Sequence, residues 1–152
     1  MTRITGSTKT YTHAQGLSCC FRQWRAKSHC NMLHGYSLQV EVEFETEKVD
    51  DKNWVVDFGG LKEFKKYLEH LFDHTTIVDI DDPEANTFKQ MADKKMINIQ
   101  WVNAVGCEAF SKLILEWLVN WLEGQEPYSS RVIVKKVEVR EHGGNSGYTR
   151  VA

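Results

Sequence analysis

The chain is predicted to be a single α+β domain, with strands toward both ends of the sequence and two main helices between them. Two observations carry this prediction: period-two alternation over residues 36–46, and an apolar i, i+3, i+4, i+7 repeat that runs from Phe110 to Trp121. At 152 residues, 1–152 suits one domain that buries roughly two thirds of its unfolded surface. The expected order is ββααββ, with a four-stranded antiparallel sheet and both helices on one face.

Each strand is predicted from its own residues. In 36–46, apolar residues alternate with acidic and amide residues, as in a half-buried strand. The segment 16–22 is rich in small and aromatic residues and is expected to pair with it as a hairpin. Valines over 131–140 predict a third strand, and the glycine-rich turn that follows leads to a short fourth strand at 148–151.

The first main helix is predicted to follow Asp57, a plausible N-cap, and the second to end at Gly124. The apolar face of the first helix comprises Leu61, Phe64, Leu68 and Leu71. A polar connection at 79–105 is expected to hold a minor helix near 84–95.

Four antiparallel strands with helices on one face leave two sheet edges open, so we expect closure against further copies of the chain.

Charge and composition exclude several classes of function. The net charge is -2 and the charged residues are dispersed, so the sequence has no basic stripe for a phosphate backbone and no nucleic-acid partner is expected. No apolar run reaches the roughly 18 residues that a membrane helix needs, and no membrane partner is expected. Four unevenly spaced cysteines favour free thiols in a reducing compartment, which predicts a cytoplasmic protein.

The segment from Cys30 to Tyr36 is the strongest candidate for a site. It puts a thiol four residues ahead of the His34 imidazole, at the start of the alternating strand. This pair of residue types is able to exchange protons with a substrate or to bind a metal.

Five motifs in order resemble the 6-pyruvoyl-tetrahydropterin synthase / 6-carboxytetrahydropterin synthase family, over about residues 16–150. They are the Cys30-to-Tyr36 segment, the stretch 54–62 (Trp-Val-Val-Asp-Phe-Gly-Gly-Leu-Lys), Phe72-Asp73-His74, Glu108 opening the second helix, and Val139-Arg140-Glu141. The resemblance implies the tunnelling fold, in which trimers close their sheets into a barrel and two trimers stack as a hexamer. It also implies sites that lie between subunits.

The resemblance implies roles for individual residues. Cys30 matches the catalytic cysteine, Asp73 and His74 match the relay that accompanies it, and Glu141 matches the carboxylate that anchors the pterin. Glu108 matches the glutamate that opens the helix, where it either contacts the substrate or serves as a first-turn acid stabilised by the helix dipole. We expect the groups at 30, 34, 74 and 141 to meet in one cleft bordered by neighbouring copies.

The implied zinc site is only partly matched. The family pattern has three histidines, whereas this chain has Phe21 or a neighbouring cysteine at the first position, His34 at the second and Tyr36 at the third. Catalytic zinc takes three protein ligands and an open position. Either the metal has been lost, or substitute ligands come from Cys19, Cys20 or His29.

Three functions follow from this pattern. The first is a lyase similar to 6-carboxytetrahydropterin synthase, which acts on 7,8-dihydroneopterin triphosphate in the biosynthesis of deazaguanine nucleosides of the queuosine type. The second is a divergent, metal-free member that binds a pterin or purine-like ligand without the zinc-dependent chemistry. The third is a thiol-dependent enzyme such as a related cyclohydrolase, which would depend on Cys30 alone.

Overall fold

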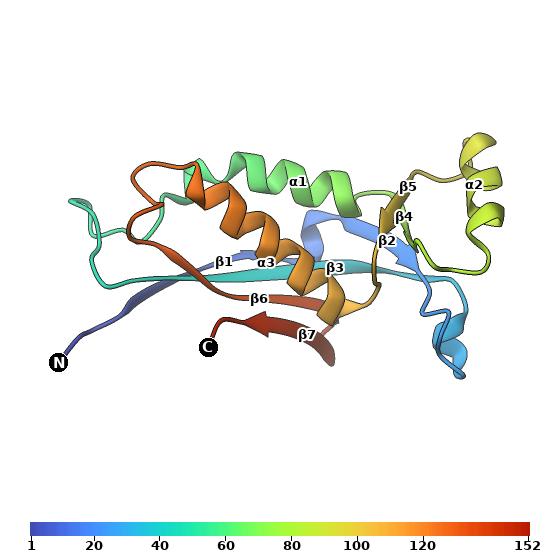
Figure 1. The fold of residues 1–152 in the computed structure, drawn as a ribbon, viewed down its shortest axis with the longest axis horizontal. Coiled ribbons are helices and arrows are strands. Elements are labelled where there is room, and N and C mark those ends of the chain that lie inside the picture. The colour runs from blue at the N-terminus through green and yellow to red at the C-terminus, as the bar shows by residue number, and fades with distance from the viewer.

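The computed structural model describes residues 1–152 as an elongated sheet that carries helices α1 and α3 on one face (Figure 1). A third helix, α2, lies at one end of the molecule with the strands β4 and β5. The strands are β1 (Thr5–Tyr11), β2 (Leu17–Phe21), β3 (His34–Thr46), β4 (Thr75–Asp79), β5 (Ile99–Val102), β6 (Ile133–His142) and β7 (Asn145–Arg150), and the helices are α1 (Lys62–Phe72), α2 (Ala85–Asp93) and α3 (Cys107–Glu123).

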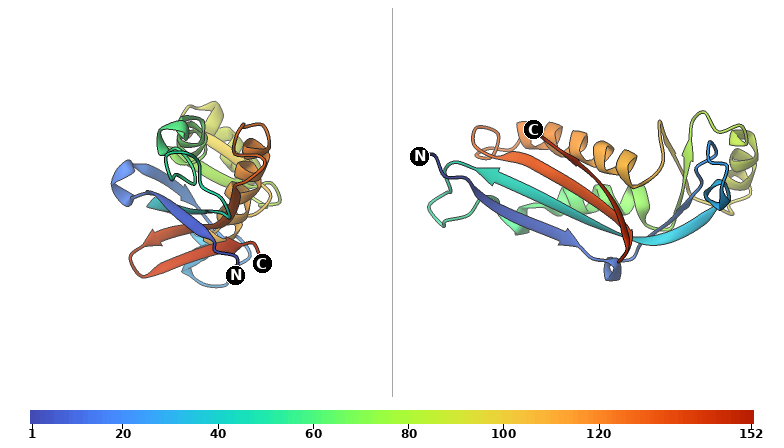
Figure 2. Two further views of the ribbon diagram at one scale, coloured as in Figure 1. Left: turned by 90° about the vertical axis from the view of Figure 1, so that its left-hand side faces the viewer. Right: turned by 90° about the horizontal axis from the view of Figure 1, so that it is seen from below.

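Strand β3 is the spine of the sheet. Its first part pairs with β2, from Leu38 opposite Leu17 to His34 opposite Phe21. Its second part pairs with β1 along the same edge and with β6 along the other edge. The view from below shows β3 running between β1 and β6, with both chain termini toward one end of the molecule (Figure 2).

The α+β class and the two helices on one face are confirmed, but the predicted strand set and element order are wrong. The sheet has seven strands, and it is mixed because β4 pairs in parallel with both β2 and β5. The four-stranded antiparallel part is β1-β3-β6-β7, so its edge strand is β1 rather than the predicted 16–22 segment. The observed order is β1-β2-β3-α1-β4-α2-β5-α3-β6-β7.

The three unpredicted strands lack an alternating pattern. In β1 only Tyr11 is buried, because the other residues of this edge strand are exposed or half-buried. All five residues of β4 are buried, including the polar Thr75, Thr76 and Asp79, so its sequence shows no alternation between a buried and a solvated face. β5 has only four residues. Period-two alternation detects strands with one buried and one solvated face, and none of these segments is of that kind.

The predicted start of α1 also needs correction. Asp57 caps the short 3-10 turn Phe58–Gly60, where its Oδ1 accepts the Gly59 N–H at 2.9 Å, and α1 itself begins at Lys62. The end of α3 at Gly124 is confirmed. The minor helix expected near 84–95 is α2.

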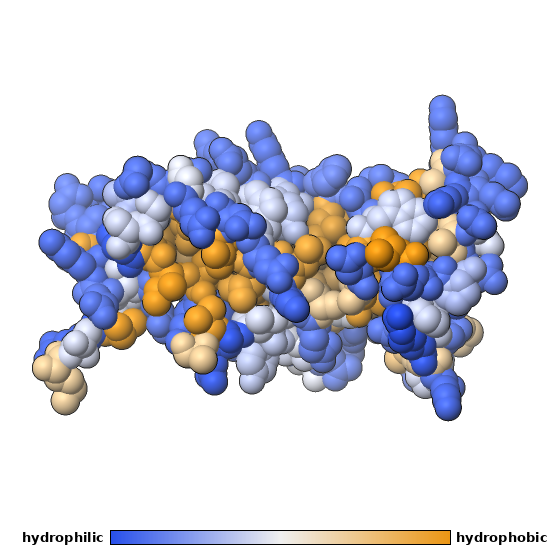
Figure 3. Space-filling model, viewed as in Figure 1, coloured by the Kyte–Doolittle hydropathy of each residue, from blue (hydrophilic) through white to orange (hydrophobic).

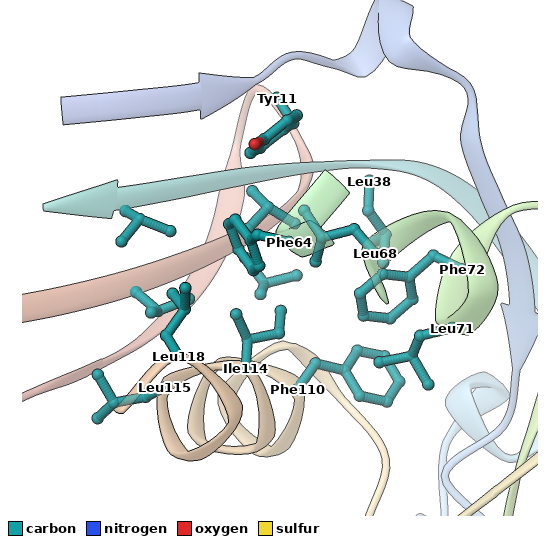
Figure 4. Packing of buried hydrophobic residues seen from close by; sticks show 14 of the residues in the cluster. Tyr11, Leu38, Phe64, Leu68, Leu71, Phe72, Phe110, Ile114, Leu115 and Leu118 are labelled. Carbon is teal, nitrogen blue, oxygen red and sulfur yellow. The ribbon is translucent and has the colours of Figure 1, made fainter. Parts of the chain in front are cut away.

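The core lies between the sheet and the two main helices (Figure 4). Phe64 and Phe72 of α1 and Phe110 of α3 have no exposed surface, and they meet the fully buried side chains of β3 and β6. Tyr11 closes the end of this core beside β1, with its ring 5.6 Å from that of Phe64. Burial of aromatic rings on this scale is the main stabilising contribution to the fold.

Some apolar surface remains uncovered. In the space-filling view it gathers beside the C-terminal half of α3 and the adjoining ends of β6 and β7 (Figure 3). Val119, Ile133 and Val151 are 40–52% exposed there. None of the helices combines the length and the apolar character needed to cross a membrane.

The core is predicted to lose stability in alkali. Burial raises the pKa of Tyr11 and of Tyr67 from 10.0 to about 12, and it raises the pKa of Cys19 from 9.0 to about 12. The folded protein therefore holds these protons more tightly than the unfolded chain does. Their stabilisation is fully present below about pH 9 and disappears as the pH rises toward 12. Urea unfolding is expected to show that the free energy of unfolding falls between pH 8 and about pH 11, and that it falls less in the Tyr67→Phe variant. A free energy of unfolding that stays constant over this range would contradict the raised pKa values of these buried groups.

Candidate functional site

Two hollows flank the sheet at the end where β2, β3 and the start of α3 meet. The hollow on the helix side has a volume of about 510 Å³, and the hollow on the other side has about 660 Å³. They share no lining residue. The first is lined by Cys107, Glu108, Glu141, Gly144, Asn145 and Ser146.

Glu141 is directed into the helix-side hollow by the strand that carries it. Val137 and Val139 of β6 are fully buried on the helix face, and Glu141 follows them at the same period of two. A register shift between Arg140 and His142 interrupts the pairing of β6 with β7 at this residue. Such irregularities often re-aim a side chain beside a binding site. Glu141 is half-buried, and no lysine, arginine or histidine forms an ion pair with it.

The start of α3 forms the opposite wall. Gly106 takes φ 113° immediately before the helix, and Glu108 lies in the first turn. β7 approaches this turn so closely that a Cβ on Gly147 would lie 2.6 Å from the Glu108 nitrogen, which makes glycine necessary there. Cys107 is buried beside both carboxylates. Burial and the charges of Glu141 and Glu108 raise its pKa to about 12, so it remains a thiol near neutral pH.

Tyr36 lies between Glu141 and the hairpin that carries Cys30. Its ring lies 5.3 Å from that of His34 and 6.3 Å from that of His142. Burial, followed by the charge of Glu141 and the proximity of Cys30, raises the pKa of the Tyr36 phenol. Glu141, Tyr36 and Cys30 therefore belong to one neighbourhood on the helix side of the sheet.

Cys30 lies in the 3-10 turn His29–Asn31, between β2 and β3. The Ser28 hydroxyl caps this turn by accepting the Cys30 N–H at 3.4 Å. The Cys30 carbonyl accepts the Gln23 N–H at 3.0 Å, which closes the loop on itself. The thiol is partly exposed.

Two buried carboxylates hold this loop against the segment after β4. Asp82 binds the Arg22 guanidinium through both oxygens, at 2.6 and 2.9 Å. Burial alone would raise the pKa of Asp82, but the bonds from Arg22 keep it below its usual value. Asp79 accepts the Trp24 indole N–H at 3.0 Å and a guanidinium N–H of Arg25 at 3.1 Å. Nothing in the sequence pairs these residues, because they are more than 50 positions apart.

Asp73 and His74 lie on the other side of the sheet from Glu141. His74 follows α1, takes φ 58°, and donates its backbone N–H to the Ser18 carbonyl at 2.7 Å. Its side chain lines the larger hollow with Ser18 and Cys20, residues that alternate with the buried positions of β2. The Asp73 carboxylate lies 2.6 Å from His74 Nδ1, and the imidazole is 90% exposed.

Within one chain the predicted site is thus divided. The groups at 30, 34 and 141 share the helix side of the sheet, since the partners of Cys19 and Phe21 in β3 are Tyr36 and His34. No hydrogen bond or ion pair joins either member of the Asp73–His74 pair to that group. Convergence of all four groups in a cleft between copies stays a prediction.

Two members of the helix-side site were not identified from the sequence as site residues. The sequence predicts no site role for Cys107, and it presents Tyr36 only at the position of a replaced metal ligand. The signal for Cys107 is its position directly before Glu108, the glutamate that opens the second helix in the family pattern. For Tyr36 the signal was the strand register, which puts it on the same face as His34.

The helix-side residues do not provide the donors that a catalytic zinc ion needs. His34 is the imidazole that contacts both Phe21 and Tyr36, and the only other imidazole nearby, that of His142, lies 6.3 Å from the Tyr36 ring. Of the proposed substitutes, Cys19 is buried with its pKa raised to about 12, and Cys20 lies on the other face with its sulfur 3.2 Å from Thr76 Oγ1. The chain contains no group of three or more His, Cys, Asp or Glu side chains that could hold a metal ion, and the third substitute, His29, is exposed.

Comparison with known proteins identifies the class. Residues 10–150 match the sequence profile of the family described as 6-pyruvoyl tetrahydropterin synthase, and the chain belongs to that family. It is 28% identical over 112 residues to a 6-carboxy-5,6,7,8-tetrahydropterin synthase of Aquifex aeolicus, which covers 71% of this chain and 68% of that protein. A protein of the same name from Helicobacter pylori is 25% identical over 76% of this chain and 58% of its own length. The matches to the Rickettsia proteins of that name span less than half of each of those proteins.

Solved structures share the fold. An uncharacterized protein of Wolinella succinogenes superimposes with a TM-score of 0.83, at 22% identity over 99% of both chains. The 6-pyruvoyl tetrahydropterin synthase of Plasmodium vivax gives a TM-score of 0.67 at 15% identity, over 98% of this chain and 99% of that one. At these identities the likeness establishes the tunnelling fold and not the activity.

The loop that carries Cys30 is predicted to depend on Asp82. Asp82→Asn removes a carboxylate that is 1% exposed and binds Arg22 twice, so the free energy of unfolding should fall by about 2 kcal/mol. Iodoacetamide should then modify Cys30 faster, as followed by peptide mass spectrometry. Asp81→Asn is the matched control, because its carboxylate is 67% exposed and lies 4.0 Å from Arg25. Equal labelling rates in the two variants would show that the clamp does not position the loop.

Proposed function

We propose that the protein is a pterin-handling enzyme that acts on 7,8-dihydroneopterin triphosphate, as a lyase of the 6-carboxytetrahydropterin synthase type. The observation that carries the proposal is the half-buried carboxylate of Glu141, which faces the helix-side hollow without a cationic partner. A half-buried carboxylate calls for hydrogen-bond donors, and apart from the neutral Tyr36 and Cys107 side chains beside it no charged group of this chain supplies them. The similarity to the Aquifex and Helicobacter proteins supports the same ligand class.

A pterin supplies the required donors. Its ring N–H and exocyclic amine lie side by side, so one carboxylate is able to accept both in a paired, charge-assisted arrangement. Glu141 would hold this edge of the ring, while Glu108 contacts the ligand from the first turn of α3. Gly147 matters to this arrangement because it lets β7 pack against the backbone of that turn.

The proton transfers are assigned to Cys30 and His74. Cys30 would act as the general base on carbons next to the ring, and His74 as the acid. Asp73 accepts from His74 Nδ1 at 2.6 Å, which fixes the ring and leaves Nε2 for the substrate. The product would be a 6-substituted tetrahydropterin on the way to deazaguanine nucleosides.

This assignment requires more than one copy of the chain. Cys30 and Glu141 lie on one side of the sheet and His74 on the other, and an imidazole that is 90% exposed gains a water-excluded site only when another molecule covers it. β1 and β7 are free edges of the four-stranded antiparallel part of the sheet. Pairing between these edges, together with burial of the apolar surface beside α3 and β7 (Figure 3), favours a trimer or a hexamer.

A second candidate function has specific support. Phe21 and Tyr36 lie beside His34 where additional metal ligands would be needed, and this favours a metal-free member that binds a pterin or purine-like ligand without turning it over. The two candidates share the ligand-binding role of Glu141 and differ in whether triphosphate is released.

Incubation with 7,8-dihydroneopterin triphosphate tests the proposal. Wild-type protein is expected to release triphosphate, Cys30→Ser to bind the substrate without releasing it, and Glu141→Gln to bind it roughly 10- to 100-fold more weakly, because a charged, paired hydrogen bond is lost. Glu138→Gln is the control, since that carboxylate is satisfied by Arg140 and Ser146.

The outcomes separate the candidates. Binding by the wild type without release, measured by pterin fluorescence, would support the metal-free binder and contradict the lyase. Absence of binding, or equal binding by the Glu141→Gln and wild-type proteins, would contradict both.

A further inference from the structure

Three aromatic rings on the helix side of the sheet form a compact triangle. Their centroids are 6.0 Å apart for Phe21 and His34, 6.1 Å for Phe21 and Tyr36, and 5.3 Å for His34 and Tyr36. The strand register fixes the arrangement: Phe21 of β2 pairs with His34 of β3, and Tyr36 is two positions further along on the same face.

These separations are close to those that three imidazoles adopt around one zinc ion. With nitrogens about 2.0 Å from a tetrahedral zinc ion, the centroids of the three rings lie roughly 5 Å apart. The backbone of the hairpin thus presents three side chains at a spacing suited to a shared metal.

His34 is also oriented as a metal ligand would be. Its Nδ1 lies 2.7 Å from the Met32 carbonyl, which is able only to accept, so Nδ1 carries the proton and Nε2 keeps its lone pair. Histidines that bind metals commonly donate their other ring N–H to a backbone carbonyl in this way. His34 has this orientation although neither neighbouring ring, that of Phe21 or that of Tyr36, is an imidazole.

The donor set nevertheless rules zinc out. Phe21 has no donor atom, and a phenol such as that of Tyr36 is not among the usual zinc ligands. Phe21 is 4% exposed and packs against Phe110 at 5.1 Å, so it has become part of the core. A single imidazole falls short of the three protein ligands that a catalytic zinc ion takes.

We infer that the Phe21–His34–Tyr36 cluster is a converted metal site, which keeps the geometry of a zinc cage but binds its ligand without zinc. His34 Nε2 accepts a hydrogen bond and the Tyr36 hydroxyl donates one, a combination suited to hydroxyl groups on a substrate side chain. Phe21 supplies an apolar wall. The inference rests on the proposed function only in taking that side chain to belong to a pterin.

Replacing Phe21 and Tyr36 with histidines, which restores the missing metal ligands, tests the inference. The wild type and the Phe21→His/Tyr36→His double variant are purified without chelators, loaded with zinc and desalted, and zinc is then measured by mass spectrometry. The double variant is expected to retain about one zinc per chain and the wild type essentially none. Adding His34→Ala to the double variant should remove the metal. Cobalt substitution should give the visible absorption of a tetrahedral ion in the double variant alone.

Several results would overturn the inference. One is wild-type protein that retains one zinc per chain and loses it on His34→Ala substitution. Another is a double variant with a native circular dichroism spectrum that takes up no zinc. If the buried Phe21→His change prevents folding, Tyr36→His alone still places two imidazoles on one face, and it should compete with a zinc indicator better than the wild type does; equal competition would contradict the inference.

These measurements are independent of the proposed activity. Zinc content is read without any pterin, so a failure to bind pterin would leave the converted-site result unchanged. Conversely, triphosphate release by a wild type that is free of zinc would support both proposals, and release that requires zinc would overturn the inference while leaving the pterin function intact.

Discussion

The pairing of one long strand with neighbours on both of its edges is the constraint on which the rest of the structure depends. β3 pairs with β1 and β6 in the antiparallel part of the sheet, where β7 follows β6. It also pairs with β2, beyond which β4 and β5 continue the sheet. Its helix-facing side chains are fully buried from Leu38 to Phe44, under α1 and α3. Toward its start, the same face leaves the fully buried core, and His34 and Tyr36 are only half-buried there. The stability of the core and the position of the site therefore have a single origin.

The sheet that organises the site also divides it. Alternation along β2 directs Cys19 and Phe21 to the helix side and Ser18 and Cys20 to the other side. Parallel pairing of Cys20 with Thr76 then brings the start of β4, and His74 before it, to that other side. A reaction that uses both Cys30 and His74 must draw them from different molecules, which makes assembly of the protein part of its chemistry.

The two halves of the predicted site, on the two sides of the sheet, differ in the charged and polar groups that they carry. On the helix side, two carboxylates and the Cys107 thiol line the hollow, and no basic side chain forms an ion pair with either carboxylate, so the hollow favours a ligand that donates hydrogen bonds. On the other side, the imidazole of His74 is already oriented by a carboxylate. The acidic half suits the donor edge of a planar heterocycle, and the second half suits proton delivery.

The sequence predicts those helices and strands that have one buried face and one solvent-exposed face. β3 and α3 were predicted because their apolar periods are long, whereas β1 is an exposed edge and β4 is buried throughout, so neither shows a period. Glu141 could be proposed from its motif, but the irregular pairing that aims it could not. The division of the site could not be predicted either, because it depends on the parallel pairing of β2 with β4, which joins residues more than 50 positions apart.

Complementation between inactive variants tests most directly whether the site is built by two copies. Cys30→Ser chains co-expressed with His74→Ala chains should regain about a quarter of the wild-type triphosphate release, because one pairing in four unites an intact Cys30 with an intact His74. Cys30→Ser co-expressed with Glu141→Gln should release no more triphosphate than Glu141→Gln chains alone, since both residues belong to the same half of the site. Recovery in the second mixture, or none in the first despite wild-type assembly, would contradict the account.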